Sequence, residues 1–163
     1  MNESEFPAIF DGTSPSQLNA LLAQGDVTLS TPGSGGYGIA SGLTFVVPEG
    51  RTLLVDTILN VRRDATLIIE GTVIILGGGR LNSDGHASSG TGTIIIAEGG
   101  KLVNNGYVEI AMKSVLTNEG AITNNGTTGN LGRFEVREGV QFTRGVVDGT
   151  RALTIHRLAV IIP

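Results

Sequence analysis

The stretch Thr-Leu-Ile-Ile-Glu-Gly at residues 66–71 is a short apolar run closed by a Glu-Gly pair, and it decides the fold because it recurs along the chain. The Glu-Gly pairs are Glu49-Gly50, Glu70-Gly71, Glu98-Gly99, Glu119-Gly120 and Glu138-Gly139. One interval is longer than the others, and it contains the Gly/Ser-rich segment 77–92. With about eight residues of that segment set aside, the period is about 20 residues, which is typical of a solenoid and not of a compact sandwich.

The apolar pieces between these turns predict three short strands per repeat. Alternation within the pieces, as in residues 43–47, points one side of each strand inward. The first series of strands is 43–47, 66–69, 93–97, 114–117, 134–136 and 153–155; the second is 52–55, 73–76, 101–103, 121–123, 140–142 and 159–162; the third is 58–61, 80–82, 107–110, a degenerate piece near Leu131, and 146–147. The run 94–96 is apolar on both faces, so we expect its outer face to be covered.

The N-terminal part has a different character from the repeats. Residues 1–13 form an acidic leader with an apolar patch, and residues 14–25 predict a short helix. Ser14 suits the N-cap, Pro15 the first helical position and Gly25 the stop. Its apolar stripe is Leu18, Leu21 and Leu22. We therefore expect one domain over residues 14–163, capped by the helix, with residues 77–92 leaving it as an inserted loop and residues 1–13 available as an arm between subunits.

A second stacking pattern is independent of the first. Asn104-Asn105-Gly106 recurs as Asn124-Asn125-Gly126, one period later. Stacked Asn side chains can hydrogen-bond along the axis of a solenoid, and Asn tolerates the left-handed backbone of tight turns. Two ordinary turns are the alternative, but the matching period favours a ladder.

These rungs resemble right-handed parallel β-helix proteins of the pectate-lyase, phage tailspike and bacterial surface-adhesin type. The resemblance covers about residues 14–163 and rests on a helix, a first strand and rungs that end in Glu-Gly. It implies an all-β fold with right-handed winding, and the period gives about six to seven rungs. The motifs identify the architecture and leave the function open.

Composition narrows the possible structural and functional classes further. Hydrophobic residues make up 40% of the 163 residues but aromatic residues only 4%, so the core must be aliphatic. There is no Cys, which excludes disulfides and thiolate metal sites. No apolar stretch approaches the ~18 residues of a membrane span, so we expect no membrane insertion. The first residues lack the basic start and apolar stretch of a signal peptide, which leaves open export by another route, a processed chain, or assembly inside a cell or virion.

Charge is distributed unevenly along the chain. Residues 1–50 carry Glu3, Glu5, Asp11, Asp26 and Glu49 and no Lys or Arg. Residues 131–163 carry Arg133, Arg137, Arg144, Arg151 and Arg157 against Glu135, Glu138 and Asp148. On a solenoid, sequence position maps onto axial position, so this asymmetry predicts an electric dipole along the rod. The Arg residues are interleaved with acids and lack aromatic partners, so no nucleic-acid partner is expected.

Residues that could carry chemistry are few. The five Glu of the Glu-Gly pairs, if stacked ~4.8 Å apart, would repel unless solvated, paired or metal-bound. Solvated turn residues are the favoured interpretation, and Ca²⁺ binding is the alternative. His86 and His156 are isolated, and no nucleophile elbow, zinc spacing or phosphate loop is present. We therefore expect no catalytic residues, no metal and no cofactor, and a protein that is not an enzyme.

The ends of the solenoid carry the functional hypothesis. A parallel β-helix is an open stack whose terminal rung offers unpaired backbone groups and a slice of apolar core. The expected assembly interface combines an apolar patch in the leader with the apolar last rung: Phe6, Ile9, Phe10, Leu158, Val160, Ile161 and Ile162. This predicts a subunit that polymerises head to tail into a filament or fibre on a bacterial or viral surface, its main partner being itself.

Two other functions stay open at this stage. A trimeric tailspike-like or adhesin-like module would bind surface glycans, with surface polysaccharide as a second partner. A carbohydrate-active enzyme is the third. An intracellular polymer also remains an alternative to the extracellular location.

Overall fold

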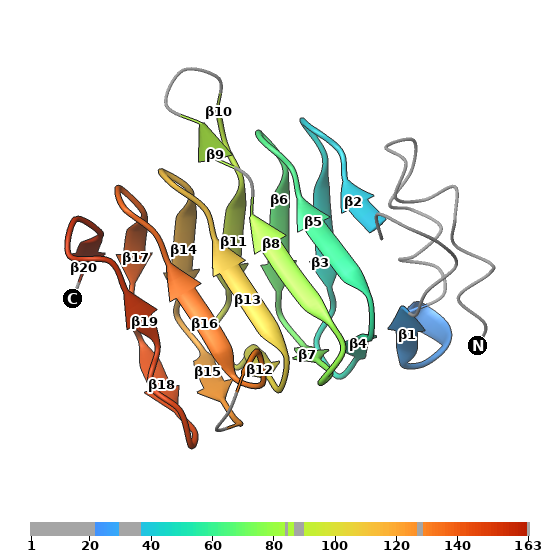
Figure 1. Ribbon diagram of the computed structural model, residues 1–163. Coiled ribbons are helices and arrows are strands. Elements are labelled where there is room, and N and C mark those ends of the chain that lie inside the picture. The colour runs from blue at the N-terminus through green and yellow to red at the C-terminus, as the bar shows by residue number, and fades with distance from the viewer. Residues whose placement is uncertain (1–21, 30–36, 84, 87–89, 127–128, 163) are drawn as a thin grey trace.

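The computed structural model describes residues 22–29, 37–83, 85–86, 90–126 and 129–162, and these form a parallel β-helix (Figure 1). Apart from one two-stranded antiparallel hairpin, its strands lie in three parallel six-stranded sheets, which we call sheets A, B and C. Each turn of the chain adds one strand to each sheet, so six strands per sheet make six rungs. The all-β, β-helical fold class predicted from the repeat is confirmed.

The strands follow the chain in the repeating order A, B, C. Sheet A contains β1 (Val27–Leu29), β4 (Thr52–Val55), β7 (Thr72–Ile75), β12 (Lys101–Asn104), β15 (Ala121–Asn124) and β18 (Val146–Asp148). Sheet B contains β2 (Tyr37–Ile39), β5 (Ile58–Val61), β8 (Arg80–Ser83), β13 (Tyr107–Ile110), β16 (Arg133–Val136) and β19 (Thr154–Ile155). Sheet C contains β3 (Thr44–Val47), β6 (Thr66–Ile69), β11 (Thr93–Ile96), β14 (Val115–Asn118), β17 (Gln141–Thr143) and β20 (Val160–Ile162).

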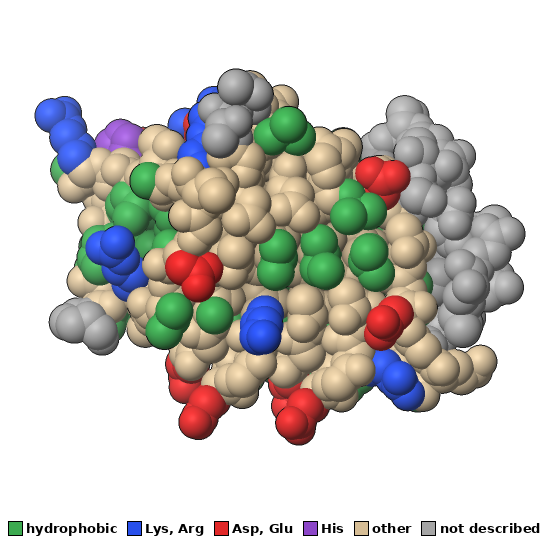
Figure 2. Space-filling model, turned by 90° about the horizontal axis from the view of Figure 1, so that it is seen from below, with side chains coloured by type: hydrophobic (Ala, Val, Ile, Leu, Met, Phe, Trp, Pro, Cys, Tyr) green, Lys and Arg blue, Asp and Glu red, His purple; other side chains and the backbone are tan. Residues whose placement is uncertain are grey.

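Side chains alternate between the two faces of each sheet. In β4, for example, Leu53 and Val55 are buried while Thr52 and Leu54 are only partly so. The outward aliphatic side chains of sheet A line up across rungs, and Figure 2 shows this face from below. The inward side chains stack on their counterparts in the next rung, as Leu53 does on Val73. Period-two alternation in every rung therefore builds one continuous core.

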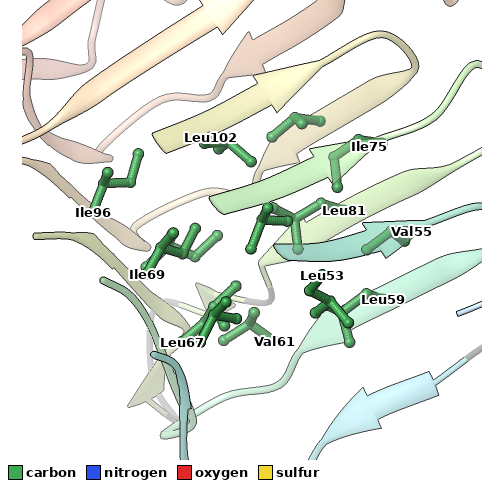
Figure 3. Close-up of a cluster of buried hydrophobic side chains, with 14 of the residues drawn as sticks. Leu53, Val55, Leu59, Val61, Leu67, Ile69, Ile75, Leu81, Ile96 and Leu102 are labelled. Carbon is green, nitrogen blue, oxygen red and sulfur yellow. The ribbon is translucent and has the colours of Figure 1, made fainter. Parts of the chain in front are cut away.

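The core is aliphatic, as the composition predicts. Figure 3 shows side chains of successive rungs, such as Leu53, Leu67 and Leu81, meeting in the interior from all three sheets. In the described part of the chain, the largest fully buried side chains are Phe45, Phe134 and Phe142. Each fully buried aliphatic or Phe side chain contributes roughly 1.5–3 kcal/mol, so core stacking holds the rungs together.

The N-terminal cap is visible only at its last turn. Residues 22–24 are helical, and Leu22 is completely buried against the core. Residues 14–21, with the predicted N-cap Ser14, and the leader 1–13 lie outside the described residues. The helix-like element therefore stands where the sequence predicts it, next to β1.

The single long interval in the repeat contains a hairpin. Within the segment 77–92, β8 is a regular strand of sheet B, so the excursion is shorter than the predicted inserted loop. It leaves the solenoid between β8 and β11, where β9 (Gly85–His86) and β10 (Gly90–Thr91) pair antiparallel. The hairpin projects from the corner between sheets B and C (Figure 1).

The five Glu-Gly pairs do not form one column, which corrects the stacked-carboxylate expectation. At the corner from sheet C to sheet A, Glu70 aligns with Pro48 and not with Glu49, because Ile69 pairs with Val47 and Thr72 with Thr52. Glu49 and Glu98 thus lie in turns two residues longer than those of Glu70 and Glu119. Glu138 lies at a different corner, between β16 and β17. The alternation of turn lengths breaks the predicted axial row of Glu side chains.

The strand series predicted for the last two rungs is wrong by one sheet. No strand forms near Leu131 in the described part of the chain; residues 129–132 belong to a turn, and sheet B continues at Arg133–Val136. Residues 134–136 and 153–155 therefore lie in sheet B, 140–142 and 159–162 in sheet C, and 146–147 in sheet A. A longer corner after β15 absorbs the residues that were counted as a degenerate strand.

Candidate functional site

The last rung, β18 to β20, exposes an apolar surface at one end of the rod. Each of these strands is the final strand of its sheet, with a neighbour on one side only among the described residues. The exposed large hydrophobic side chains of this rung are Val146 at 59%, Leu158 at 58%, Val160 at 52%, Ile161 at 42% and Ile162 at 40%. Figure 1 shows the open edge of the rung at the C-terminal end.

Register divides the predicted C-terminal residues between two surfaces. Ile161 pairs with Phe142, which is completely buried. Ile161 therefore continues the column of core side chains, and the exposed part of its side chain lies at the end of the rod. Val160 and Ile162 pair with Gln141 and Thr143 on the outer face of sheet C. Partly buried Val147, Leu153, Ile155 and Ala159 complete the axial apolar slice. Phe6, Ile9 and Phe10 lie outside the described residues.

The opposite end of the rod begins with the first strand of each sheet, and Leu22 of the helical residues 22–24 is buried against the core there. Strands β1, β2 and β3 begin the same three sheets, and each has one neighbouring strand among the described residues. Asp26 and Glu49 are the charged residues of segment 22–50, whereas the last rung carries Arg144, Arg151 and Arg157 against a single Asp148. The two ends are therefore alike in strand arrangement and opposite in charge.

The predicted asparagine ladder stacks at the corner after sheet A. Asn104 and Asn124 are completely buried, and Asn104 Nδ2 donates to Asn124 Oδ1 at 2.9 Å. One position further on, Asn125 Nδ2 donates to Asn105 Oδ1 at 3.2 Å. Asn124 Nδ2 also donates to the carbonyls of Gly132 and Arg151. The ladder therefore ties three rungs together through one corner.

A charged network on the outer face of sheet B is the main cluster of ionisable groups. Glu109 and Glu135 lie opposite each other in β13 and β16. Arg137 Nη2 bridges them, at 2.8 Å from Glu109 and 2.7 Å from Glu135. Arg133 Nε donates to Glu135 at 2.8 Å. The two carboxylates, which would otherwise repel, are thus paired across two rungs.

Tyr107 lies within this network, between two guanidinium groups. The Arg80 Cζ atom is 4.4 Å and the Arg133 Cζ atom 5.0 Å from the centre of its ring. The Tyr107 hydroxyl oxygen is 3.0 Å from Glu109 Oε2 and 2.9 Å from Glu135 Oε2, and its proton can serve one of them at a time. Cation–π contacts and hydrogen bonds therefore hold β8, β13 and β16 together on their outer side.

The pKa directions follow from this arrangement. Burial raises the pKa of Tyr107 to about 12, and hydrogen bonds to Glu135 and Glu109 add to the effect. Burial alone would raise the carboxyl pKa values of Glu109 and Glu135. Hydrogen bonds from Tyr107 and the arginines, together with the arginine charges, outweigh it and lower both. Carboxylates that stay ionised and a phenol that stays protonated at neutral pH are poor general acids and bases, so the network suits a clamp between rungs.

A shallow hollow of about 350 Å³ lies beside the network. It is lined by Glu109, Ala111, Met112, Arg137, Glu138 and His156. His156 is exposed, and its Nδ1 accepts a hydrogen bond from the backbone of Leu158. The side chain of His86 lies outside the described residues, and within the described part of the chain no three or more His, Asp or Glu side chains are grouped so that they could hold a metal ion.

Sequence reasoning missed the sheet B network. Arg80 with Asn82 and Tyr107 with Glu109 occupy alternate positions of predicted strands, and Glu135 lies in the predicted strand 134–136, which Arg133 directly precedes. The strand predicted near Leu131 places residues 134–136, and Glu135 with them, in a different series from 80–82 and 107–110, so the sequence alone does not show their alignment. Alternating charged residues in successive third-series strands could have revealed the cluster.

Comparison with protein-family models, curated proteins and solved structures finds no match to this chain. Among the described residues, no helix has the length and apolar character needed to cross a membrane.

Proposed function

We propose that the protein is a structural β-solenoid subunit that polymerises head to tail into a filament or fibre on a bacterial or viral surface. The observation that carries the proposal is the open last rung, in which β18, β19 and β20 present free edges around exposed Ile161. The partner is the first rung of a second copy, with edges β1, β2 and β3. Stacking the copies continues all three sheets.

Both backbone and side chains favour such a contact. Pairing a free edge satisfies N–H and C=O groups that water otherwise serves. Covering Ile161 and the other side chains of the axial slice removes apolar surface worth roughly 1.5–3 kcal/mol for each side chain that becomes fully buried. An in-register strand addition gives main-chain hydrogen bonds, while the core column supplies the apolar contact.

Charge supports the orientation of the copies. Asp26 and Glu49 flank the first described rung and the last rung carries an excess of Arg, so a head-to-tail approach brings opposite charges together. Such complementarity speeds encounter more than it strengthens the final contact, and it is screened by salt. We expect salt to slow assembly without dissolving finished polymer.

The test compares Ile161→Asp with Leu131→Asp. Ile161 is 42% exposed on the axial surface and Leu131 is 43% exposed on a lateral corner, so the same charge is added at equal exposure in two places. Wild-type protein should form filaments in electron micrographs. Ile161→Asp should give soluble monomers by sedimentation velocity with an unchanged β circular-dichroism spectrum, while Leu131→Asp should form filaments like the wild type.

Wild-type protein that stays monomeric at high concentration would overturn the proposal, as would an Ile161→Asp variant that polymerises normally. Discrete trimers in place of filaments would favour a side-by-side module of the glycan-binding tailspike or adhesin kind.

A further inference from the structure

The outer face of sheet C carries no charged residue in any of its six strands. Its outward positions are the alternate residues whose neighbours point into the core. They are Thr44 and Val46, Thr66 and Ile68, Thr93 and Ile95, Val115 and Thr117, Gln141 and Thr143, and Val160 and Ile162. Eleven of these twelve positions are β-branched Thr, Val or Ile, and Gln141 is the exception.

The other two outer faces are different. Sheet B carries the Arg80, Glu109, Arg133 and Glu135 network on its outer side. Sheet A has an aliphatic row at its centre, but Asp26, Lys101 and Asp148 lie on the same face, and Figure 2 shows charged side chains around that row. An uncharged outer face is thus a property of sheet C alone among the three.

Register makes the sheet C face regular. Thr44, Thr66 and Thr93 align in one row, and Val46, Ile68 and Ile95 align in the next. Rows of like β-branched side chains about 4.8 Å apart form ridges that interdigitate with an identical set of ridges when two sheets pack face to face. A face without charge also meets its own copy without like-charge repulsion. The face is therefore complementary to itself.

The area of the sheet C face determines whether a contact between two such faces is stable. Four residues of strand and six rungs cover roughly 350–400 Å² on each partner, so one pair of molecules buries about 750 Å² in total, below the ~1,200 Å² of a stable interface. Two or three copies stacked end to end multiply this area and pass that threshold. The same face is thus too small for a dimer of single subunits and large enough for two rods.

We propose that the outer face of sheet C is the lateral interface through which filaments of this protein associate side by side. This inference rests on the proposed head-to-tail assembly. The surface that packs against this face is the outer face of sheet C in a second filament. Val160 and Ile162, which the last rung adds to this face, extend it up to the junction with the next copy.

The absence of Cys from the chain allows a direct test. Thr93→Cys places one thiol at the centre of the sheet C face, and Thr72→Cys places one at a comparable strand-start position on the outer face of sheet A. A bifunctional thiol reagent that spans ~10 Å, the spacing of packed sheets, then reports which faces meet. Crosslinked dimers are counted on a denaturing gel after polymerisation, in the wild-type background and with Ile161→Asp.

We expect Thr93→Cys to crosslink in polymerised protein at least several-fold more than Thr72→Cys, and to lose that excess in the Ile161→Asp background. Equal crosslinking by the two thiols in polymer would overturn the lateral interface and assign the face to another partner. Crosslinking of Thr93→Cys without any filaments would keep the sheet C contact and refute the head-to-tail proposal instead. An absence of both filaments and Thr93→Cys crosslinks would refute both.

A second pair of variants tests the sheet C contact by electron microscopy. Ile95→Lys puts a charge at the centre of the sheet C face, and Ile74→Lys puts it on the aliphatic row of sheet A. Single, unbundled filaments are expected from Ile95→Lys, and bundled filaments from the wild type and Ile74→Lys. Bundles of Ile95→Lys equal to those of the wild type would contradict the inference.

Discussion

At the scale of single residues, the corners between sheets depend on glycines for two different physical reasons. Gly99 has a left-handed backbone with φ of 82°, and a Cβ there would meet open space. Gly100 has no left-handed backbone, but a Cβ would lie 2.1 Å from the carbonyl oxygen of Ile69 in the rung below. The first glycine is required by backbone conformation and the second by the closeness of stacked rungs.

These two causes predict different losses of stability. Gly100→Ala should lower the free energy of unfolding by about 2–3 kcal/mol, because the clashing atom is backbone fixed in a stacked rung. Gly99→Ala should cost about 1–2 kcal/mol from its left-handed conformation alone. Gly25→Ala, with open space and no left-handed backbone, should stay within about 0.5 kcal/mol of the wild type. Urea unfolding of the three variants checks the order, and a Gly100→Ala variant as stable as Gly25→Ala would contradict the close approach.

At the scale of elements, the strands and their turns were predictable to different extents. The period, the alternation and the Asn repeat predict the β-helix and the strands of its three sheets from β3 to β15, because each depends on local residues that recur. Strands β1 and β2 precede the predicted strand series. The assignment fails after β15, where the corner preceding Arg133 is longer than those after β4, β7 and β12, and Leu131 resembles part of a strand. A corner of variable length carries no periodic pattern, so sequence alone could not decide in which sheet the next strand would lie.

The charged network on sheet B could not be predicted, because its contacts depend on the length of that corner. Ion pairs between β13 and β16 depend on the register of strands more than 20 residues apart, which the length of the corner sets. Once the register is known, the pairing follows from simple electrostatics. The candidate C-terminal interface was easier to find, because an apolar last rung is visible in the composition of a single segment.

The network also predicts a dependence of stability on pH. The carboxyl pKa values of Glu109 and Glu135 lie below their ordinary value of 4.5 in the folded protein. Their contribution to stability is therefore complete above pH 4.5, and it is lost as the pH falls through the lowered pKa values, because the unfolded chain binds protons first. The free energy of unfolding of unassembled protein should decrease with acid below about pH 4.5.

The control for this titration is a glutamate outside the network. Glu109→Gln combined with Glu135→Gln should make the acid-induced decrease shallower, whereas Glu98→Gln, at an exposed turn, should leave its slope unchanged. Denaturant unfolding between pH 7 and pH 3 measures all three. Equal slopes for the double variant and the wild type would show that the network does not act as a clamp between rungs.

At the scale of the whole molecule, each rung contacts only its neighbours along the axis, so stability should vary with axial position. Central strands such as β12 and β13 have partners on both sides, whereas β18 to β20 have them on one. Amide hydrogen exchange of the unassembled protein should be slowest in the central rungs and fastest in the last one. On polymerisation the last rung should gain protection, and a last rung that exchanges equally fast before and after would argue against end-to-end contact.

The hairpin formed by β9 and β10 leaves the rod at one corner without disturbing the strands on either side. Six rungs at about 4.8 Å each give a subunit length of about 29 Å, so in a filament one hairpin would occur every 29 Å or so along the axis. The strand pair β9 and β10 would therefore recur along a filament at an interval set by the number of rungs. Adding or removing one rung would change that interval by about 4.8 Å.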